Sequence, residues 1–345
     1  MMEYNIDILV AGCNTTCMHC YVNGGKFPAM KMEDFSYCIE KLKAVFAHFG
    51  EKLSFTLDNE VYNHPQADEV LELVEKECAI NYYHHGSTTG IAILNHPRRE
   101  QLLDILKRNK WLDVSFAIHG GKENHNKLVN NDCGLESIVA ASKLFKDAGF
   151  HVYVSLMLSK LFREDLEEID AILEEIPYDD LLPVIPDFYP TSRLLRYQDI
   201  RCNSLEYAEI CDFLQAKNVD CKVVNNALVT LQEEAVLQRI TEEELKKEFF
   251  SKKTAFFHID NKLDFYVGNT GVPLKKCGNL KACTSEEIIE WIASSEDNYY
   301  ETKTIHYEDL LAAVRKDELT LSKENYVYPN IIAAVLAMVC NGRKK

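Results

Sequence analysis

The sequence lacks an apolar run long enough to cross a membrane. Its longest uncharged apolar stretch covers residues 331–340, whereas a membrane-spanning helix needs roughly 20 residues. The apolar stretch at residues 8–11 is too short for a secretory signal, and it has no basic flank. We therefore expect a soluble, cytoplasmic protein with no membrane partner, in which residues 331–340 form a buried helix.

Clustered positive charge is also scarce. The 345 residues contain 38 Lys and Arg against 54 Asp and Glu, which gives a formal net charge of −16. A nucleic-acid surface needs clustered Lys and Arg to neutralise phosphates, so we expect no nucleic-acid partner. The acidic residues are spread over segments such as 164–175 and 242–248, where they are typical of solvated helix faces.

Cysteine, in contrast, is abundant, with 12 in the chain. In a reducing compartment these residues are not expected to form a disulfide scaffold. A free cysteine is also a good core residue. The spacing of the cysteines, more than their number, therefore has to decide their role.

The first two thirds of the chain alternate between strand-like and helical patterns, with no internal repeat. This alternation predicts a parallel sheet with right-handed crossovers. Six units are fewer than the eight of a closed barrel, so we predict an α/β fold built on a partial (β/α)6 barrel. The expected strands are residues 6–10, 53–57, 80–84, 112–118, 152–157 and 181–185, and the expected helices between them are 32–49, 67–77, 100–109, 135–148 and 163–175.

The pattern changes after residues 193–204, which are rich in Arg, Tyr and Asp. A helix is expected at 206–216, a short strand near 222–224, a charged helix at 241–251 and a β-like stretch at 255–267, followed by turns at Gly268 and Gly271. We therefore divide the chain into a core at residues 1–205 and a smaller α+β accessory domain at residues 206–345.

Three cysteines lie within eight residues, in the run Cys13-Asn-Thr-Thr-Cys17-Met-His-Cys20. The run directly follows the first expected strand, and parallel α/β folds place ligand chemistry in the loops after their strands. Three thiolates in one loop can bind an iron–sulfur cube and leave one iron open. A zinc site that takes His19 as a fourth ligand is the alternative.

This run resembles the signature of the radical S-adenosylmethionine (SAM) superfamily, and its continuation through Tyr21 is especially similar to members with a SPASM or twitch extension. The resemblance implies that Cys13, Cys17 and Cys20 bind a [4Fe-4S] cluster and that SAM binds the fourth iron. It further implies that an electron from the cluster cleaves SAM to a 5′-deoxyadenosyl radical, which removes a hydrogen atom from a substrate. It places Tyr21 among the cofactor-binding residues.

A second likeness follows the second expected strand, where the family has a Gly-Gly-Glu-Pro motif and a later His-Pro pair. Glu60 matches the glutamate of that motif, and residues 64–65 match the pair. Asp58 and Asn59 replace the two glycines. Both residue types tolerate left-handed backbone conformations, and we expect Asp58, Asn59 and Glu60 to contact SAM.

Weaker resemblances to the motifs of this family occur in or after the later expected strands. They occur in the order that the family shows, so the resemblance implies a role for each in binding the cofactor. The residues are Thr89 after the third expected strand, His119 after the fourth, Ser155 in the fifth and Arg193 in the loop after the sixth.

The region around Cys277 and Cys283 resembles part of a SPASM or twitch domain, with a Gly-Asn-Leu turn and a helix that we expect to begin at Ser285. Three interpretations remain open for the two cysteines. They could bind an auxiliary [4Fe-4S] cluster, Cys277 could donate a hydrogen atom at the active site, or both could be inert core residues.

The resemblance implies a radical SAM enzyme of oxidoreductase or epimerase type, supplied with electrons by a donor such as flavodoxin or ferredoxin. We expect a peptide substrate, as in ribosomal peptide modification. Oxidation or epimerisation of an amino sugar or another small metabolite is the alternative. The altered Gly-Gly-Glu-Pro motif also leaves open a non-catalytic iron–sulfur electron-transfer protein, and a zinc-stabilised binding module is the third possibility.

Overall fold

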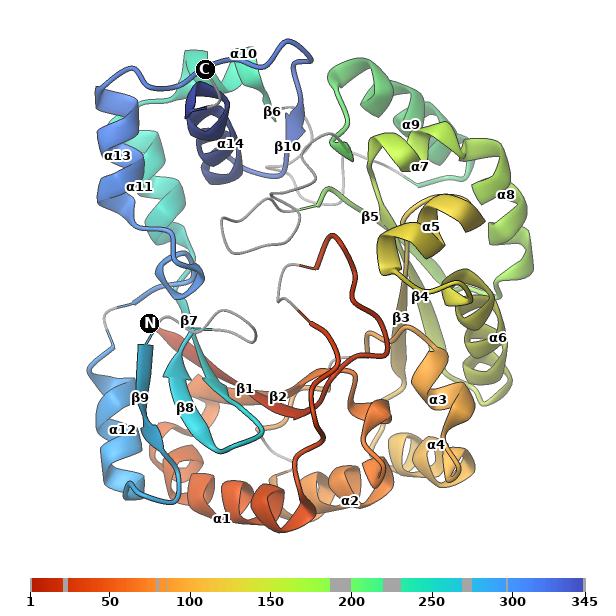
Figure 1. Ribbon diagram of the computed structural model, residues 1–345, viewed down its shortest axis with the longest axis vertical. Coiled ribbons are helices and arrows are strands. Elements are labelled where there is room, and N and C mark those ends of the chain that lie inside the picture. The colour runs from red at the N-terminus through yellow and green to blue at the C-terminus, as the bar shows by residue number, and fades with distance from the viewer. Residues whose placement is uncertain are drawn as a thin grey trace.

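The computed structural model describes residues 2–20, 24–78, 81–84, 86–186, 200–219, 231–268, 275–295 and 297–343. Its strands lie toward the inside and its helices toward the outside (Figure 1). Two parallel sheets form the core of the first half of the chain. One contains β1 (Glu3–Ala11) and β2 (Leu53–Asn59), and the other contains β3 (Asp113–Ile118), β4 (His151–Met157) and β5 (Asp180–Val184).

The third predicted strand is reduced to isolated contacts between these sheets. Tyr82 pairs in parallel with Phe55 of β2, and Ser87 pairs in parallel with Ser115 of β3. Gly86 explains the close approach at this point, because a Cβ on this residue would lie 2.1 Å from the carbonyl oxygen of Asp113. The two sheets therefore follow one another as an open barrel of parallel strands, which confirms the predicted α/β partial-barrel fold.

The outer helices cover the barrel with their apolar faces. α1 (Met32–Phe49) and the other amphipathic helices bury one stripe of side chains each, as their periodicity predicts. The remaining helices of this half are α2 (Ala67–Cys78), α3 (Ile91–Asn95), α4 (Arg99–Arg108), α5 (Lys122–Val129), α6 (Gly134–Asp147), α7 (Lys160–Glu164), α8 (Leu166–Glu175) and α9 (Ser204–Ala216), with short 3-10 turns η1 (Gly50–Lys52) and η2 (Val61–Asn63).

The helix predicted at 163–175 is interrupted at Asp165. The Asp165 carboxylate accepts hydrogen bonds from the backbone N–H of Gly121 at 2.7 Å and from Asn124 Nδ2 at 2.8 Å. Asp165 thus binds the start of α5 instead of continuing a helix, which separates α7 from α8. The prediction of one helix was wrong because this contact is long-range.

The chain returns to the first sheet after residue 250. β7 (Thr254–Ile259) pairs in parallel with β1, and an antiparallel hairpin of β8 (Asp264–Val267) and β9 (Lys275–Asn279) extends the sheet in the order β2-β1-β7-β8-β9. α12 (Ser285–Ala293) packs on α1 from outside, where Ser285 Oγ donates to the carbonyl of Lys41 at 3.0 Å. The first sheet therefore contains strands from both sides of residue 205. The division into two domains at that residue stays a prediction.

α12 begins at Ser285, as the sequence predicts. The side chain of Thr284, one residue before the predicted start, accepts from the backbone N–H of Glu287, and the Glu287 side chain accepts from the backbone N–H of Thr284. This reciprocal capping box places the cap at Thr284.

A second hydrophobic core belongs to the last part of the chain. Phe249, Tyr300 and Met338 are buried at its centre. It is formed by α10 (Glu233–Arg239), α11 (Glu242–Ser251), η4 (Glu301–Lys303), α13 (Tyr307–Arg315) and α14 (Ile331–Arg343), next to the short strands β6 (Leu231–Gln232) and β10 (Val327–Tyr328). α14 contains the predicted helix at residues 331–340, and most of its side chains are buried.

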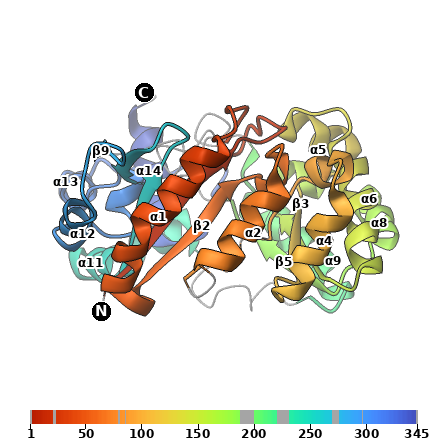
Figure 2. The ribbon, with the colours of Figure 1, turned by 90° about the horizontal axis from the view of Figure 1, so that it is seen from below.

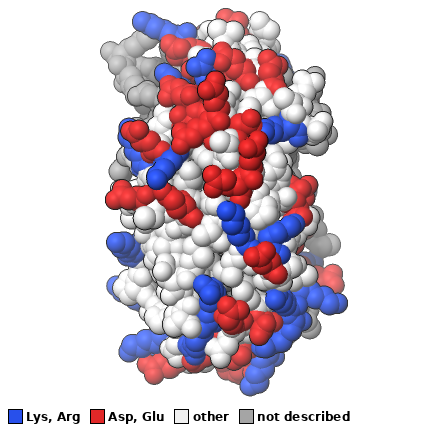
Figure 3. Space-filling model, turned by 90° about the vertical axis from the view of Figure 1, so that its right-hand side faces the viewer, with Lys and Arg blue, Asp and Glu red and all other residues white. Residues whose placement is uncertain are grey.

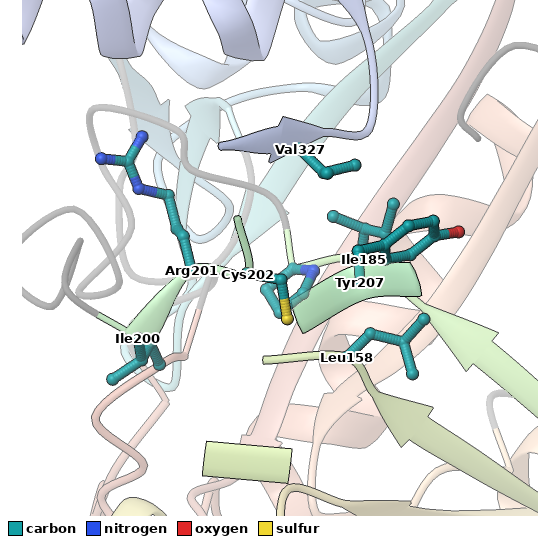
Figure 4. Close-up of a pocket in the computed structure, with 8 residues that line it drawn as sticks. Leu158, Ile185, Ile200, Arg201, Cys202, Tyr207 and Val327 are labelled. Atoms are coloured by element: carbon teal, nitrogen blue, oxygen red, sulfur yellow. The ribbon is translucent and has the colours of Figure 1, made fainter. Parts of the chain in front are cut away.

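This helical unit joins the barrel beside Cys202. The backbone N–H of Val327 donates to the carbonyl of Cys202 at 3.0 Å. Figure 4 shows Val327 facing a small apolar pocket that is also lined by Leu158, Ile185 and Tyr207. The buried Arg201 points away from that pocket and donates to Tyr328 Oη, which itself donates to Glu233 at 2.6 Å.

The outer surface matches the expected charge distribution. Figure 3 shows Asp and Glu gathered on the upper half of the face that α7, α8 and α9 cover in Figure 1. The glutamates of α8 are solvent-exposed, while Ile169, Ile172 and Leu173 of the same helix are buried. No helix among the described residues is long and apolar enough to span a membrane.

Candidate active site

The cysteine run forms a loop at the carboxyl end of β1. Figure 2 shows this loop at the edge opposite the N-terminus, beside α5. The backbone N–H of Met18 donates to the carbonyl of Leu128 at 2.7 Å, and Asn130 Nδ2 donates to Thr16 Oγ1 at 2.6 Å. α5 and the residue that follows it therefore hold the loop over the end of the barrel.

The sulfur atoms of the loop lie around Gly24. The backbone N–H of Gly24 donates to Cys20 Sγ at 3.0 Å. A Cβ at Gly24 would lie 3.3 Å from Cys20 Sγ, 3.4 Å from Cys13 Sγ and 2.8 Å from Asn59 Oδ1. Glycine thus leaves room for the two sulfurs to approach the same point, and a larger residue would fill that room.

Cys17 completes the group from the same loop. Its thiol donates to Thr15 Oγ1 at 3.2 Å, and all three thiols are partly accessible. Burial raises the pKa of Cys13 above its ordinary value, and the nearby carboxylate of Glu60 and the other two thiols raise it further. Three thiols so close to one another are suited to binding positively charged iron, which stabilises thiolates.

These thiols suit a cluster better than a single ion. No group of three Cys, His, Asp or Glu side chains among the described residues is arranged to hold one metal ion. A structural zinc needs four ligands at about 2.0–2.3 Å from one centre, whereas each thiolate on a [4Fe-4S] cluster binds a different iron. The residues fit the cluster, and the geometry does not favour the zinc alternative with His19.

Glu60 lies at the end of β2 and is 2% exposed. Thr88 Oγ1 donates to both of its carboxylate oxygens at 3.0 Å, and the backbone N–H and Oγ1 of Thr89 donate to Oε2 at 2.9 and 3.2 Å. Burial raises the pKa of Glu60 to about 7, although these hydrogen bonds act in the opposite direction. The carboxylate is therefore held in a fixed position where a cationic ligand would stabilise its charge.

Asp58 and Asn59 fill the places of the expected glycines. Asn59 has a φ of 60°, in the left-handed region that an asparagine tolerates, and its Oδ1 accepts from Cys13 Sγ at 3.7 Å. Asp58 Oδ1 accepts from the backbone N–H of Asn59 at 2.7 Å, while Asp58 Oδ2 and Asn59 Nδ2 are buried and no described residue forms a hydrogen bond with either atom. Burial raises the pKa of Asp58 to about 6. Buried polar atoms that lack a partner are typical of a site that binds a polar ligand.

One cavity of about 670 Å³ connects these groups. It lies inside the barrel and includes all three cysteines and residues 58–60. Its other described lining residues come from the strands and from the loops and helices that follow them, and Phe256, Tyr299 and Lys303 belong to the last part of the chain. They include Asn5, Asp7, Thr56, Thr88, Thr89, Ser115, His119, Ser155, Phe256, Tyr299 and Lys303.

Three of the residues that the weaker resemblances predicted line this cavity. Thr89 contacts Glu60 as described. His119 is buried against His19, with 3.8 Å between ring centroids, and burial lowers its pKa. Ser155 Oγ lies 3.3 Å from Ser115 Oγ on the neighbouring strand. Their roles in binding SAM stay predictions.

Other predicted residues are not brought to the cavity. Cys277 in β9 and the buried Cys283 just after it are not among the described residues that line it. Burial raises the pKa of both thiols, which fits the interpretation as core residues better than that of a hydrogen donor. Tyr21 and Arg193 lie outside the described residues, as does the strand expected near 222–224.

The polar residues in the middle of the barrel were not predicted from the sequence. Asn5 and Asp7 lie on β1, and Lys303 comes from η4 of the helical unit. Asn5 and Asp7 could have been predicted from the sequence. They lie two residues apart in a strand that is buried on both faces, so their polar side chains must share one face. Lys303 carried no local signal, since only the tertiary fold brings η4 to the barrel.

The comparison with known families agrees with this geometry. The sequence model of the Radical SAM superfamily matches residues 8–176, which include the cysteine loop, Glu60 and Ser155. The chain contains a radical SAM domain. Radical SAM proteins use a [4Fe-4S] cluster and SAM, so these are the cofactors of this chain. No curated protein matches the sequence.

Solved structures share the fold beyond the radical SAM domain. Native anSMEcpe with bound AdoMet and Cp18Cys peptide is 15% identical with a TM-score of 0.56, over 99% of this chain and 97% of that one. SuiB of Streptococcus suis bound to the precursor peptide SuiA is 11% identical with a TM-score of 0.54, over 96% of this chain and 76% of that one. The likeness covers almost all of this chain, which confirms a radical SAM fold with a C-terminal extension.

Proposed function

We propose that this radical SAM enzyme abstracts a hydrogen atom from a peptide. The observation that carries the proposal is that Cys13, Cys17, Cys20 and Glu60 line a single cavity. That cavity lies within the range of about 300–1,000 Å³ typical of small-molecule sites. It therefore has room for SAM and for a short part of a substrate.

Cys13, Cys17 and Cys20 would hold the cluster through three of its four irons. When bound, the cluster supplies the electron that cleaves SAM into methionine and the 5′-deoxyadenosyl radical, which takes hydrogen from a substrate. The backbone N–H of Gly24 donates to Cys20 Sγ, and hydrogen bonds to sulfur tune the potential of such clusters. An external donor such as flavodoxin or ferredoxin would supply the electron.

Glu60, Asp58 and Asn59 would hold SAM. The amino and sulfonium groups of SAM are positive, and two buried carboxylates beside the cysteines offer the opposite charge. Asp58 Oδ2 and Asn59 Nδ2, which have no hydrogen-bond partner among the described residues, offer an acceptor and a donor for its polar groups. The buried position of these groups strengthens such contacts, because the local dielectric is low.

Two observations support a peptide as the substrate. The solved structures with the same fold include anSMEcpe with the Cp18Cys peptide and SuiB with the precursor peptide SuiA. In addition, the extension contributes Phe256, Tyr299 and Lys303 to the cavity, so the substrate would contact both parts of the chain.

The proposal is tested by isotope transfer under anaerobic conditions. The protein is reconstituted with iron and sulfide, reduced and mixed with SAM and peptides from a proteolysed extract of deuterium-grown cells. We expect deuterium in the 5′-deoxyadenosine, detected by mass spectrometry. Transfer from the small-metabolite fraction alone would contradict the peptide substrate, and a cluster-loaded protein that forms no 5′-deoxyadenosine would contradict the radical chemistry itself.

A further inference from the structure

Asp7 is a carboxylate in the middle of the barrel, away from the cysteine loop. It lies on β1 opposite Thr56 of β2 and His258 of β7. Its side chain is 8% exposed and lines the cavity. A buried carboxylate at the centre of a parallel strand costs stability unless its oxygens have partners, so its position calls for a ligand or a complete hydrogen-bond network.

The hydrogen bonds that the described residues donate to Asp7 reach one of its two carboxylate oxygens. Asn5 Nδ2 donates to Oδ1 at 2.5 Å, and Thr56 Oγ1 donates to the same atom at 2.9 Å. Among the described residues, no hydrogen-bond donor reaches Oδ2. The network thus fixes the orientation of the carboxylate and leaves one acceptor oxygen for a molecule in the cavity.

Lys303 lies on the cavity wall that the C-terminal extension provides. It is 6% exposed, and its Nζ donates to Tyr299 Oη at 3.1 Å. Its charge lowers the pKa of Asp7, although burial and Asp58 together raise that pKa well above its ordinary value. The two side chains thus line the same cavity from different parts of the chain.

We propose that Asp7 and Lys303 bind an uncharged amide group of the substrate, with Asp7 Oδ2 accepting from its N–H and Lys303 donating to its carbonyl. An amide has a donor N–H and an acceptor oxygen bonded to the same carbon, and it adds no net charge. A carboxylate at this point would be repelled by Asp7 and Asp58, and an ammonium would be repelled by Lys303. The inference rests on the proposed function, because a peptide presents such amides.

Asp7 is separated from Glu60, although Asp58 is near enough to raise the pKa of Asp7. Thr56, which lies opposite Asp7, precedes Glu60 by four residues, or about 13 Å along a strand. An amide anchored at Asp7 would therefore lie deeper in the barrel than SAM. The side chain beside that amide could extend toward the cysteine end, so Asp7 and Lys303 would set which substrate atom faces SAM.

Binding of four small probes tests the amide site. N-methylbutyramide and methyl butyrate differ only in the amide N–H, and butyrate and butylammonium supply the charged alternatives. Saturation-transfer NMR on the reconstituted protein with SAM measures their relative affinities without turnover. We expect the amide to bind at least about tenfold more tightly than the ester, because a hydrogen bond to a charged group is lost, and more tightly than either ion.

Two variants assign this preference to Asp7. Asp7→Leu should bind amide and ester equally, whereas Asp104→Leu, which makes the same change on the exposed side of α4, should keep the preference. Equal binding of the two probes by the wild-type protein, tighter binding of an ion, or a preference that survives Asp7→Leu would overturn the inference. Because binding is measured without SAM cleavage, this failure is distinct from failure of the radical chemistry.

Discussion

Glu60 accepts hydrogen bonds from both the backbone N–H and the hydroxyl of Thr89. The two residues belong to different crossovers of the barrel, so the contact fixes the glutamate relative to two neighbouring loops. Together with the bonds from Thr88, it keeps a carboxylate inside the protein in one orientation. This is the arrangement expected of a residue that binds a cation at a set position.

Replacing Glu60 should weaken SAM binding. Glu60→Gln keeps the size of the side chain but removes its charge, so SAM should bind roughly tenfold or more weakly. Equilibrium dialysis of SAM against the cluster-loaded protein measures the effect. Glu75→Gln, on the exposed surface of α2 where Glu75 pairs with Arg108, is the matched control and should bind SAM like the wild-type protein.

Cys277 and Cys283 should be dispensable for SAM cleavage. Neither is among the described residues that line the cavity, so Cys277→Ser and Cys283→Ala should form 5′-deoxyadenosine at rates within about twofold of wild type, after correction for stability losses of about 1 kcal/mol. Iron content per chain should also be unchanged. A drop of about four irons per chain in either variant would instead indicate an auxiliary cluster.

The protein should lose stability in mild acid, in part through His258. Burial lowers the pKa of His258 to about 4, below the 6.5 of an exposed histidine. Because the unfolded chain binds the proton more readily, the stability due to neutral His258 is present above pH 6.5 and is lost as the pH falls toward 4. At pH 5 the loss from this group is about 2 kcal/mol.

Denaturant unfolding of His258→Phe at pH 7 and pH 5 measures this contribution. The variant cannot take up the proton, so its loss of stability over this interval should be about 2 kcal/mol smaller than that of the wild-type protein. His48→Phe, on the exposed side of α1, is the control and should lose as much as wild type. Equal losses in all three proteins would show that His258 does not contribute.

The hydroxyl of Tyr328 should stabilise the junction between the helical unit and the barrel. It accepts from Arg201 and donates to Glu233, and all three residues are buried. Tyr328→Phe leaves both charged groups without this partner, so we expect a loss of about 2–3 kcal/mol in unfolding free energy. Tyr37→Phe, which removes a half-exposed hydroxyl bonded to the carbonyl of Leu280, should cost less than about 1 kcal/mol.

Local sequence patterns predicted the outer helices and most of the parallel strands. Apolar periodicity is a local property, and α1 occupies the range that its pattern indicates. The break at Asp165 and the pairing of β7 with β1 were not predicted, because both depend on partners that are distant in the sequence. For the same reason, no pattern near residue 303 could place Lys303 beside Asp7.

The candidate site was predictable where a short motif carries its own chemistry. The cysteine loop and Glu60 were found from spacing and resemblance, and the structure brings them to one cavity. Cys277 was singled out by the same reasoning, but it lies partly buried in β9 and is not among the described residues that line the cavity, which its local sequence could not show. Asp7 could be recognised from the sequence as a charged residue within a buried strand. That it lines the cavity beside Thr56 could be seen only when the neighbouring strands were in place.

The central claim is that Cys13, Cys17 and Cys20 bind the cluster that cleaves SAM. Replacing all three by alanine, beside a control with the exposed Cys133 replaced by alanine, tests it most directly under identical anaerobic reconstitution. We predict that the triple variant loses the cluster's visible absorbance and forms no 5′-deoxyadenosine, while the control keeps both. A triple variant that still carries the cluster and still cleaves SAM would contradict the account.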